Sequence, residues 1–432
     1  MPGTARSAGC RSRRPPPPCA HRRSCPEVYA SCRFGRSCGD RPARHDVHVN
    51  ENRENSGTVA SHGTVASHGT VAVYGAYGHT GRFVVAELLE RGYTPVLVGR
   101  DAAKLDDLAA RYPGLAVRPA RADDAAALDR ALAGADAVVN TAGPFADTAA
   151  PVIEAALRAG IPYVDVAAEI EANRDTFDRF ADRARAAGTP VVPAMAFYGG
   201  LGDLLATAAM GDWTEADEAH IAYGLDSWHP TSGTRAAGEV SHRRRGGRRV
   251  RFTGGALAYH DDEPRNRTWS FPDPTGDREV VGEFTMADVV TIPSHLDIPE
   301  VRDYMAVEAA RDLSSPDTPA PVAADEDGRS AQSFVVDVVL VSGSRRRRAT
   351  AHGRDIYAVS APLAVEAVHR ILTGRTRTTG VASAGELFDA RDFLAALSTH
   401  LTVEFTAEED AASPGSVSGG GHPPLAPPAS QA

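Results

Sequence analysis

Three evenly spaced glycines are the strongest chemical signal in the sequence. They belong to the stretch Gly75-Ala-Tyr77-Gly78-His79-Thr80-Gly81. Glycines let a backbone turn tightly and approach a pyrophosphate, whose charge is stabilised by the free N–H groups at a helix start. The spacing of two residues between successive glycines is a variant of the dinucleotide-binding loop. We therefore predict that these residues bind a dinucleotide; the alternative is a tight glycine turn without a ligand.

The residue after the next apolar run favours NADP over NAD. The run TPVLVG at 94–99 is followed directly by Arg100. An NAD site normally carries an acid here for the ribose hydroxyls, whereas an arginine can pair with a 2′-phosphate. Lys104 would add charge at the same place or is an ordinary solvent-facing lysine, and Asp101 leaves NAD open as the alternative. Asp123 is a candidate contact for the adenine, or simply a helix N-cap.

A Gly-Pro turn after the fourth apolar run is expected to lie beside the ribose and nicotinamide. Ligands of an open α/β sheet lie outside the carboxyl ends of the strands, where this turn would be. The predicted cofactor contacts are Ala142, Gly143, Pro144 and Phe145. A turn that only reverses the chain is the alternative.

Three side chains are candidates for transferring a proton: Asp165, Glu169 and Tyr198. The nicotinamide itself does the hydride chemistry, so the protein needs only to supply a proton or stabilise charge. Each candidate could instead be a helix cap, a hinge contact or a core side chain. A Tyr-x3-Lys dyad is excluded, because Lys104 is the only lysine and residue 100 is an arginine.

Composition argues against several other functions. The 432 residues carry 46 basic and 56 acidic side chains, a net charge of −10, and all five cysteines precede residue 39. The cysteine positions therefore argue against a cysteine nucleophile or a cysteine-bound zinc in the folded region, and without an HExxH motif we predict no metal. The acidic balance disfavours nucleic acid. No run of about 18 apolar residues occurs, so we predict a cytoplasmic protein without a membrane partner.

Alternating strands and helices must position the candidate residues. The expected strands are 70–75, 94–99, 115–120, 136–143, 162–167 and 189–194, and the expected helices are 79–92, 101–111, 123–133, 148–159 and 171–187. Apolar strands that alternate with helices form a parallel sheet covered on both faces. We predict an α/β fold: a Rossmann-like doubly wound parallel sheet, with a second α+β domain inserted before the C-terminal helices.

Five segments are expected along the chain. They are a disordered basic extension with a GTVASH repeat (1–68), a Rossmann-like NADP-binding domain (69–200), an α+β substrate or dimerisation domain (201–359), C-terminal helices packing back on the first domain (360–405) and a disordered tail (406–432). In the second domain, 220–225, 248–260 and 333–353 are expected to form antiparallel hairpins. The stretch Ser232-Gly-Thr-Arg235 would begin a helix, either as an anion site or as a plain cap.

Several short motifs occur together: VYGAYGHTGR (73–82), VGRDAAKL (98–105), VNTAGPF (139–145), YVDVAAE (163–169), GRDIYAVSAPLAVEAVHRIL (353–372) and GVASAGELFDARDFLAAL (380–397). In this combination the chain resembles the saccharopine dehydrogenase-like NADP-binding proteins, including their trans-acting enoyl reductase branch. Tyr77, where that family often has Thr, and Ala167-Ala168, where a Gly commonly precedes the Glu, are departures. The resemblance implies a Rossmann-like domain, an inserted second domain and oxidoreduction with a pyridine nucleotide.

Together these features predict an NADP-dependent oxidoreductase. Hydride would pass from NADPH to a C=N, C=C or C=O bond of a small or acyl-linked metabolite. The alternative is a non-catalytic NADP(H)-binding regulatory or scaffold protein, which the lack of a catalytic dyad favours. A small-molecule substrate is the expected partner, and a homodimer is left open.

Overall fold

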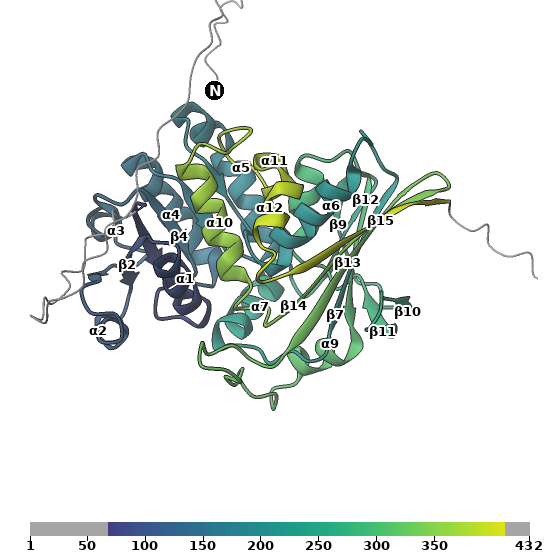
Figure 1. Ribbon diagram of the computed structural model, residues 1–432, viewed down its shortest axis with the longest axis horizontal. Coiled ribbons are helices and arrows are strands. Elements are labelled where there is room, and N and C mark those ends of the chain that lie inside the picture. Colours follow the sequence, from purple (N-terminus) through teal and green to yellow (C-terminus); the bar gives the residue numbers. More distant parts are fainter. Residues whose placement is uncertain (1–67, 411–432) are drawn as a thin grey trace, which may run out of the picture. The chain divides into compact units, whose positions relative to one another are not determined.

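A six-stranded parallel sheet forms the first part of the computed structural model, which describes residues 68–410 (Figure 1). The strands lie in the order β3-β2-β1-β4-β5-β6, so the chain changes direction between β1 and β4 as in doubly wound folds. Their bounds are β1 Thr70–Tyr74, β2 Thr94–Gly99, β3 Ala116–Pro119, β4 Ala137–Asn140, β5 Tyr163–Asp165 and β6 Val191–Val192. The predicted Rossmann-like parallel sheet is confirmed. The predicted extension before residue 68 and the tail after residue 410 lie outside the described residues.

Helices connect these strands close to where the sequence pattern placed them. They are α1 His79–Glu90, α2 Ala102–Ala109, α3 Ala125–Leu132, α4 Phe145–Ala159 and α5 Ile170–Ala187. Asp101 and Asp124 begin α2 and α3 by accepting hydrogen bonds from backbone N–H groups three residues further on. Helix α4 begins at Phe145, three residues earlier than expected, so the Gly-Pro turn leads directly into a helix start.

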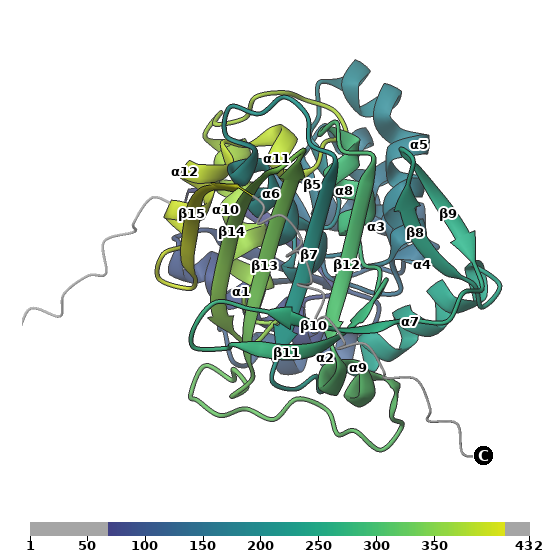
Figure 2. The same ribbon diagram turned by 90° about the vertical axis from the view of Figure 1, so that its right-hand side faces the viewer.

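The second sheet is mixed rather than purely antiparallel (Figure 2). Its main path runs β10-β11-β12-β7-β13-β14-β15, and β8 pairs with β12 and β9. The bounds are β7 Glu218–Leu225, β8 Arg249–Thr253, β9 Ala256–His260, β10 Asn266–Ser270, β11 Asp277–Gly282, β12 Glu300–Ala306, β13 Ser333–Ser342, β14 Arg345–Arg354 and β15 Thr402–Asp410. Hairpins β8–β9 and β13–β14 match the expectation. β7 is not part of a hairpin: it pairs antiparallel with the distant β13, and it pairs parallel with β12 because the long chain between them allows a crossover.

The last strand lies where a disordered tail was predicted. β15 pairs antiparallel with β14, so the predicted tail is wrong over residues 406–410. Leu401, Val403 and Phe405 alternate with polar residues, which is the pattern of a strand with one face exposed. Because this stretch is rich in acidic side chains, its alternation was not interpreted as a strand.

Helices after residue 200 cover the second sheet and close the fold. They are α6 Gly202–Met210, α7 Ser232–Arg244, α8 Asp288–Thr291, α9 Val307–Ser314, α10 Ser360–Leu372, α11 Ala384–Leu387 and α12 Ala390–Ala396. Helix α10 packs on α1, and α6 packs on β13 and β14. Helices α11 and α12 pack on α6, which lies in the part assigned to the second domain, so the prediction that they return to the first domain needs correction.

One apolar core runs from the first sheet into the second. Val73 of β1, Leu201 before α6 and Val338 of β13 belong to the same cluster of buried side chains. Burial of this kind is the main favourable contribution to folding. It also gives a firm base to the residues at the carboxyl edge of the first sheet. Within residues 68–410, no helix combines the length and apolar character needed to cross a membrane.

Two buried carboxyl groups in the second part make stability depend on pH. Asp288 accepts a hydrogen bond from the Tyr223 hydroxyl at 2.7 Å, and Asp303 accepts one from the Met286 N–H at 2.7 Å. The second oxygen of each has no hydrogen-bond partner among the described residues. Burial raises the pKa of Asp288 to about 7, and burial together with Asp288 raises the pKa of Asp303.

We expect the substitution Asp288→Asn to stabilise the protein at alkaline pH. A carboxyl whose folded pKa is raised favours folding below its unfolded pKa of 3.8, and this contribution is lost as the pH rises towards about 7. The advantage of the amide should therefore grow across that interval and then level off. Urea unfolding at several pH values measures it, with Asp106→Asn on the exposed face of α2 as the control. An advantage that is the same at every pH would contradict the expectation.

Candidate functional site

The glycine loop between β1 and α1 leaves room for an anion against its backbone. Gly75 has a φ of +91°, and a Cβ there would lie 2.9 Å from the backbone nitrogen of Ala142. Gly78 is the N-cap of α1 and provides no side-chain cap for the first N–H groups. A side chain at Gly81 would overlap the carbonyl oxygen of Gly75. The loop therefore has the close packing and free helix start that a pyrophosphate requires.

The end of β2 carries a guanidinium that no group within residues 68–410 neutralises. Arg100 is exposed and forms no hydrogen bond or ion pair with the described residues. Asp101 caps α2 and lies 3.8 Å from the Lys104 ammonium, so its carboxylate is already engaged. The Tyr77 ring lies over Gly99, where a Cβ would come within 2.7 Å of it. This arrangement leaves the Arg100 guanidinium available to an anionic group of a ligand.

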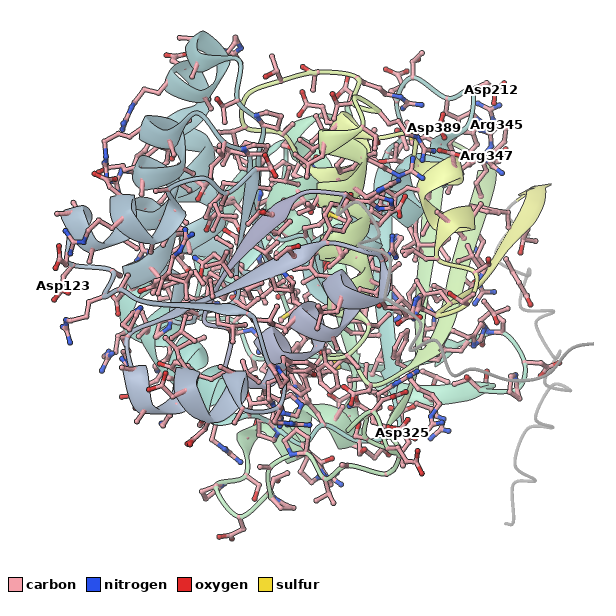
Figure 3. The ribbon with its side chains drawn as sticks, turned by 60° about the vertical axis from the view of Figure 1, so that its left-hand side comes forward. Asp123, Asp212, Asp325, Arg345, Arg347 and Asp389 are labelled. Carbon is pink, nitrogen blue, oxygen red and sulfur yellow. The ribbon has the colours of Figure 1, made fainter. Side chains whose placement is uncertain are left out.

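A second arginine at this edge escaped the sequence analysis. Arg121 follows β3 and holds Asp123 through two hydrogen bonds of 2.8 Å (Figure 3 labels Asp123). Arg121 also keeps the pKa of Asp123 below its usual value. Asp123 does not cap α3, since Asp124 does. An arginine directly after the third strand was the signal that could have indicated this pair.

The predicted cofactor residues gather around a single cavity of about 1760 Å³. Those that line it are Gly75, Tyr77, Gly78, His79, Thr80, Arg100, Lys104, Asp123, Ala142, Gly143, Pro144 and Phe145. Gly81 is the exception, because it packs beneath the loop instead of facing the cavity. Ligand cavities usually measure about 300–1,000 Å³, so this one can hold more than a single small molecule.

Of the three proton-transfer candidates, Asp165 lies away from the cavity. It is fully buried and accepts hydrogen bonds from the Tyr163 hydroxyl at 2.8 Å, Ala167 N at 3.0 Å and Ala194 N at 2.8 Å. Burial raises its pKa to about 6. A carboxylate so enclosed holds the segments after β5 and β6 together and cannot reach a substrate. Its candidacy as a catalytic residue is therefore corrected.

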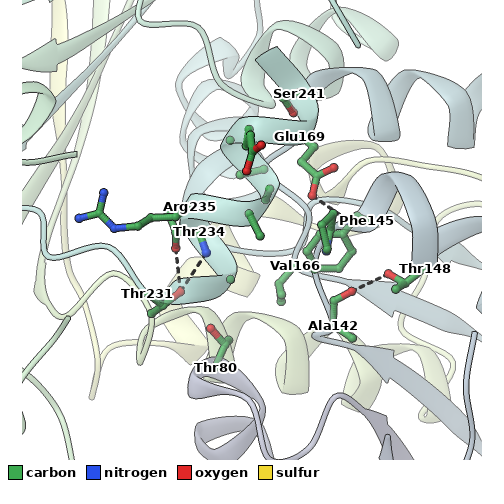
Figure 4. Close-up of a pocket in the computed structure, with 18 of the residues that line it drawn as sticks. Thr80, Ala142, Phe145, Thr148, Val166, Glu169, Thr231, Thr234, Arg235 and Ser241 are labelled. Carbon is green, nitrogen blue, oxygen red and sulfur yellow. Dashed lines mark hydrogen bonds between the residues drawn. The ribbon is translucent and has the colours of Figure 1, made fainter. Parts of the chain in front are cut away.

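Glu169 lines the cavity, but both of its oxygens are occupied. They accept hydrogen bonds from Phe145 N at 2.7 Å and Ala146 N at 3.1 Å, at the start of α4 (Figure 4). Burial raises the pKa of Glu169 to about 7. The side chain thus serves as a helix cap supplied from another element.

Tyr198 offers a hydroxyl that is free to act. The residue follows β6 at a break in the helical turn Phe197–Leu201, with φ of −90° and ψ of 125°. Its ring packs against Phe197, Tyr223 and Trp228 at centroid distances of 4.8, 4.9 and 5.3 Å. The residue lines the cavity, and its hydroxyl is buried and has no hydrogen-bond partner among the described residues. Burial holds the pKa of Tyr198 well above its usual value, so the group stays protonated.

The opposite wall of the cavity comes from residues that the sequence analysis did not single out. Trp228, Phe284 and Met286 line it, together with Tyr357 from the turn before α10. The Tyr357 hydroxyl accepts a hydrogen bond from the Trp228 ring N–H at 3.1 Å and lies 2.9 Å from the Thr234 hydroxyl. No local sequence pattern marks these residues, because they meet only in the folded chain.

The predicted helix start at Ser232 is correct, and it faces the glycine loop. Thr231 caps α7 by accepting a hydrogen bond from Thr234 N at 3.0 Å. Figure 4 shows Thr231 at the start of α7 and Thr80 of α1 on facing sides of the pocket. Arg235 donates to the carbonyl oxygens of Ser315 and Thr318, so its guanidinium is engaged by the protein. Among residues 68–410, no three His, Cys, Asp or Glu side chains are grouped so as to hold a metal ion.

Comparison with known proteins gives a family for one domain and a fold for most of the chain. Apo saccharopine dehydrogenase (L-Glu forming) from Saccharomyces cerevisiae is similar with 14% identity and a TM-score of 0.53, over 78% of this chain and 100% of that one. GenD2 from gentamicin A biosynthesis, in complex with NAD, has 16% identity and a TM-score of 0.37, and the match covers 80% of this chain and 96% of that one. No curated protein matches by sequence.

The yeast similarity supports the same fold, a parallel Rossmann-like sheet followed by a mixed sheet. The model of the saccharopine dehydrogenase NADP binding domain matches residues 71–192, which contain the glycine loop, Arg100 and the Gly-Pro turn. Residues 71–192 are thus similar to the saccharopine dehydrogenase NADP binding domain, and most of the chain shares the fold of the yeast enzyme.

Proposed function

We propose that the chain is an NADP-dependent oxidoreductase that reduces a C=N, C=C or C=O bond of a small or acyl-linked metabolite. One observation carries the proposal. A single cavity is lined by the glycine loop, by Arg100 and by Tyr198, whose buried hydroxyl has no hydrogen-bond partner among the described residues. Cofactor binding and a proton-donating group are the two requirements of such a reaction. The cytoplasmic location and a homodimer stay predictions.

Different residues at the carboxyl edge of the sheet would bind different parts of the cofactor. NADPH, when bound, would supply the hydride. Arg100 would pair with the 2′-phosphate, and the N–H groups at the start of α1 would bind the pyrophosphate. The turn at Gly143 and Pro144 lies over the second half of the sheet, where the nicotinamide half of a dinucleotide belongs.

The substrate would lie between that turn and the aromatic wall. Trp228, Phe284 and Met286 exclude water from this part of the cavity. We assign the proton donor to Tyr198, whose hydroxyl has no competing hydrogen bond in the described structure. A neutral phenol can donate its proton to the atom that gains negative charge during the reduction.

Oxidation of NADPH in the presence of candidate substrates tests the proposal. The wild-type protein should oxidise NADPH when a suitable C=N, C=C or C=O compound is present. Tyr198→Phe should bind NADPH with unchanged affinity but react about a hundredfold more slowly, because the proton donor is lost. Tyr112→Phe, outside the cavity, is the matched control.

Two results would contradict this assignment. If NADPH fails to bind, the oxidoreductase proposal falls. If NADPH binds tightly but no substrate class oxidises it, the non-catalytic NADP(H)-binding alternative is favoured. A Tyr198→Phe protein as fast as the wild type would remove the tyrosine from the mechanism while leaving the function in place.

A further inference from the structure

The first turn of α4 depends on a carboxylate from a different part of the chain. The N-cap residue of this helix is Pro144, which forms no side-chain cap. Glu169, at the end of the segment after β5, accepts hydrogen bonds from Phe145 N and Ala146 N and is 6% exposed. Hydrogen bonds to a charged acceptor are stronger than neutral ones, and α4 receives two of them at its positive end.

A second set of hydrogen bonds holds the same turn from the side of β4. The Asn140 side chain accepts from Ala142 N at 3.0 Å and donates to the Tyr163 hydroxyl at 3.1 Å. Tyr163 donates in turn to Asp165 at 2.8 Å. The Thr148 hydroxyl donates to the Ala142 carbonyl at 2.6 Å, a bond drawn in Figure 4. The turn is therefore fixed before Gly143 by Asn140 and Thr148, and after Pro144 by Glu169.

We infer that Glu169 is a positioning residue that sets the turn Gly143–Phe145 to receive the nicotinamide half of the cofactor. The inference rests on the proposed function, since it assumes a dinucleotide in this cavity. Glu169 transfers no proton here, because both of its oxygens already accept backbone N–H groups. It acts through the turn, whose residues line the cavity and follow β4, on the other side of β1 from Arg100 at the end of β2.

This placement predicts that Glu169 affects only one half of the cofactor. By the strand order of a doubly wound sheet, the adenosine half would lie on the side of β1 to β3 and the nicotinamide half on the side of β4 to β6. Adenosine 2′,5′-bisphosphate contains the first half alone and should not sense the turn. A residue that served only the stability of the fold would affect both ligands alike.

The test compares the affinities of NADPH and adenosine 2′,5′-bisphosphate in the full chain. In Glu169→Gln, one oxygen becomes an NH2 group that cannot accept, so the affinity for NADPH should fall roughly tenfold. The affinity for adenosine 2′,5′-bisphosphate should not change. Asp389→Asn is the matched control: Asp389 caps α12 by accepting from Asp392 N at 3.0 Å, and it lies far from Asp123 of the cavity in Figure 3.

The pH dependence gives a second readout. The charged groups that act on Glu169 are Asp165 of β5, which raises its pKa, and Arg244 of α7, which lowers it. With a pKa of about 7, the carboxylate is lost as the pH falls through neutrality. As the pH falls, the ratio of NADPH affinity to adenosine 2′,5′-bisphosphate affinity should therefore fall further in the wild type than in Glu169→Gln, where only the phosphates of the two ligands titrate.

Each remaining outcome separates this inference from the proposed function. Unchanged NADPH affinity in Glu169→Gln, or an equal loss for both ligands, would overturn the positioning role but leave the cofactor site intact. Failure of the wild type to bind either ligand would overturn the proposed function, and the inference with it. If Glu169→Gln does not fold, Thr148→Val removes the bond to Ala142 and should produce the same selective loss.

Discussion

The substitution Arg100→Ala should remove the preference of the protein for NADPH over NADH. The guanidinium stands at the end of β2, exposed and without an ion pair to any described residue. Its charge is therefore available to a 2′-phosphate, and bidentate pairing with a phosphate is among the strongest polar interactions. We expect the dissociation constant for NADPH to rise about a hundredfold and that for NADH to stay the same.

Thermal unfolding with each nucleotide measures this effect. A ligand present at 100 times its dissociation constant adds about 2.7 kcal/mol to the free energy of unfolding, so the wild type should show a clear shift with NADPH. In Arg100→Ala the shift should shrink to that seen with NADH. Arg111→Ala, an exposed arginine outside the cavity, should behave as the wild type. Equal loss of both nucleotides would contradict a role for Arg100 in recognising the 2′-phosphate.

Arg121 provides an internal comparison for the same site. Its guanidinium is already bound to Asp123 by two hydrogen bonds, and Asp123 contributes a negative charge of its own. The pair is nearly neutral as a unit, so we expect Arg121 to attract a phosphate less strongly than Arg100 does. The two arginines share one sheet edge but differ in how far the protein has already neutralised them.

Local sequence patterns were sufficient for the first domain because its elements are encoded locally. The apolar run Thr94–Gly99 matches the observed strand, and the predicted cofactor residues follow such strands in order along the chain. Parallel strands separated by helices place all of their carboxyl ends on one edge. Residues that follow successive strands therefore meet without any further information.

The second domain was harder because its pairings are distant in sequence. β12 was not predicted, and it pairs parallel with β7 and antiparallel with β11. Strand β15 pairs with β14, although helices α10 to α12 separate the two strands in the sequence. The aromatic wall of Trp228, Phe284 and Met286 shares this property, since its members come from separate loops.

The proton-transfer candidates show the same limit at the level of single residues. Asp165 ends β5, while Glu169 and Tyr198 follow β5 and β6, and their residue types alone could not separate these three candidates. The distinction came from hydrogen bonds: Asp165 accepts three, Glu169 accepts two from backbone groups, and the Tyr198 hydroxyl has none among the described residues. Burial and partners, which sequence spacing does not encode, decide which group is free to react.

The substitution Gly81→Ala should have the largest effect on stability. A Cβ at Gly81 would overlap the Gly75 carbonyl oxygen and lie 2.9 Å from both the Ala76 carbonyl oxygen and the Thr141 hydroxyl. All of these belong to the buried junction of β1, α1 and the turn after β4, where the neighbours cannot move apart without breaking the glycine loop. Overpacking of this kind typically costs about 3 kcal/mol or less, and contact with rigid backbone places the expected loss at the upper end.

Urea unfolding of Gly81→Ala beside Gly238→Ala tests this argument. Gly238 lies inside α7, and a Cβ there would meet no atom within 4 Å. Because alanine favours a helix over glycine, this control should gain up to about 1 kcal/mol. The opposite signs of two identical chemical changes would show that the glycine loop requires close backbone packing. Equal stability of Gly81→Ala and the wild type would mean that α1 can shift, and the pyrophosphate cradle would lose its structural basis.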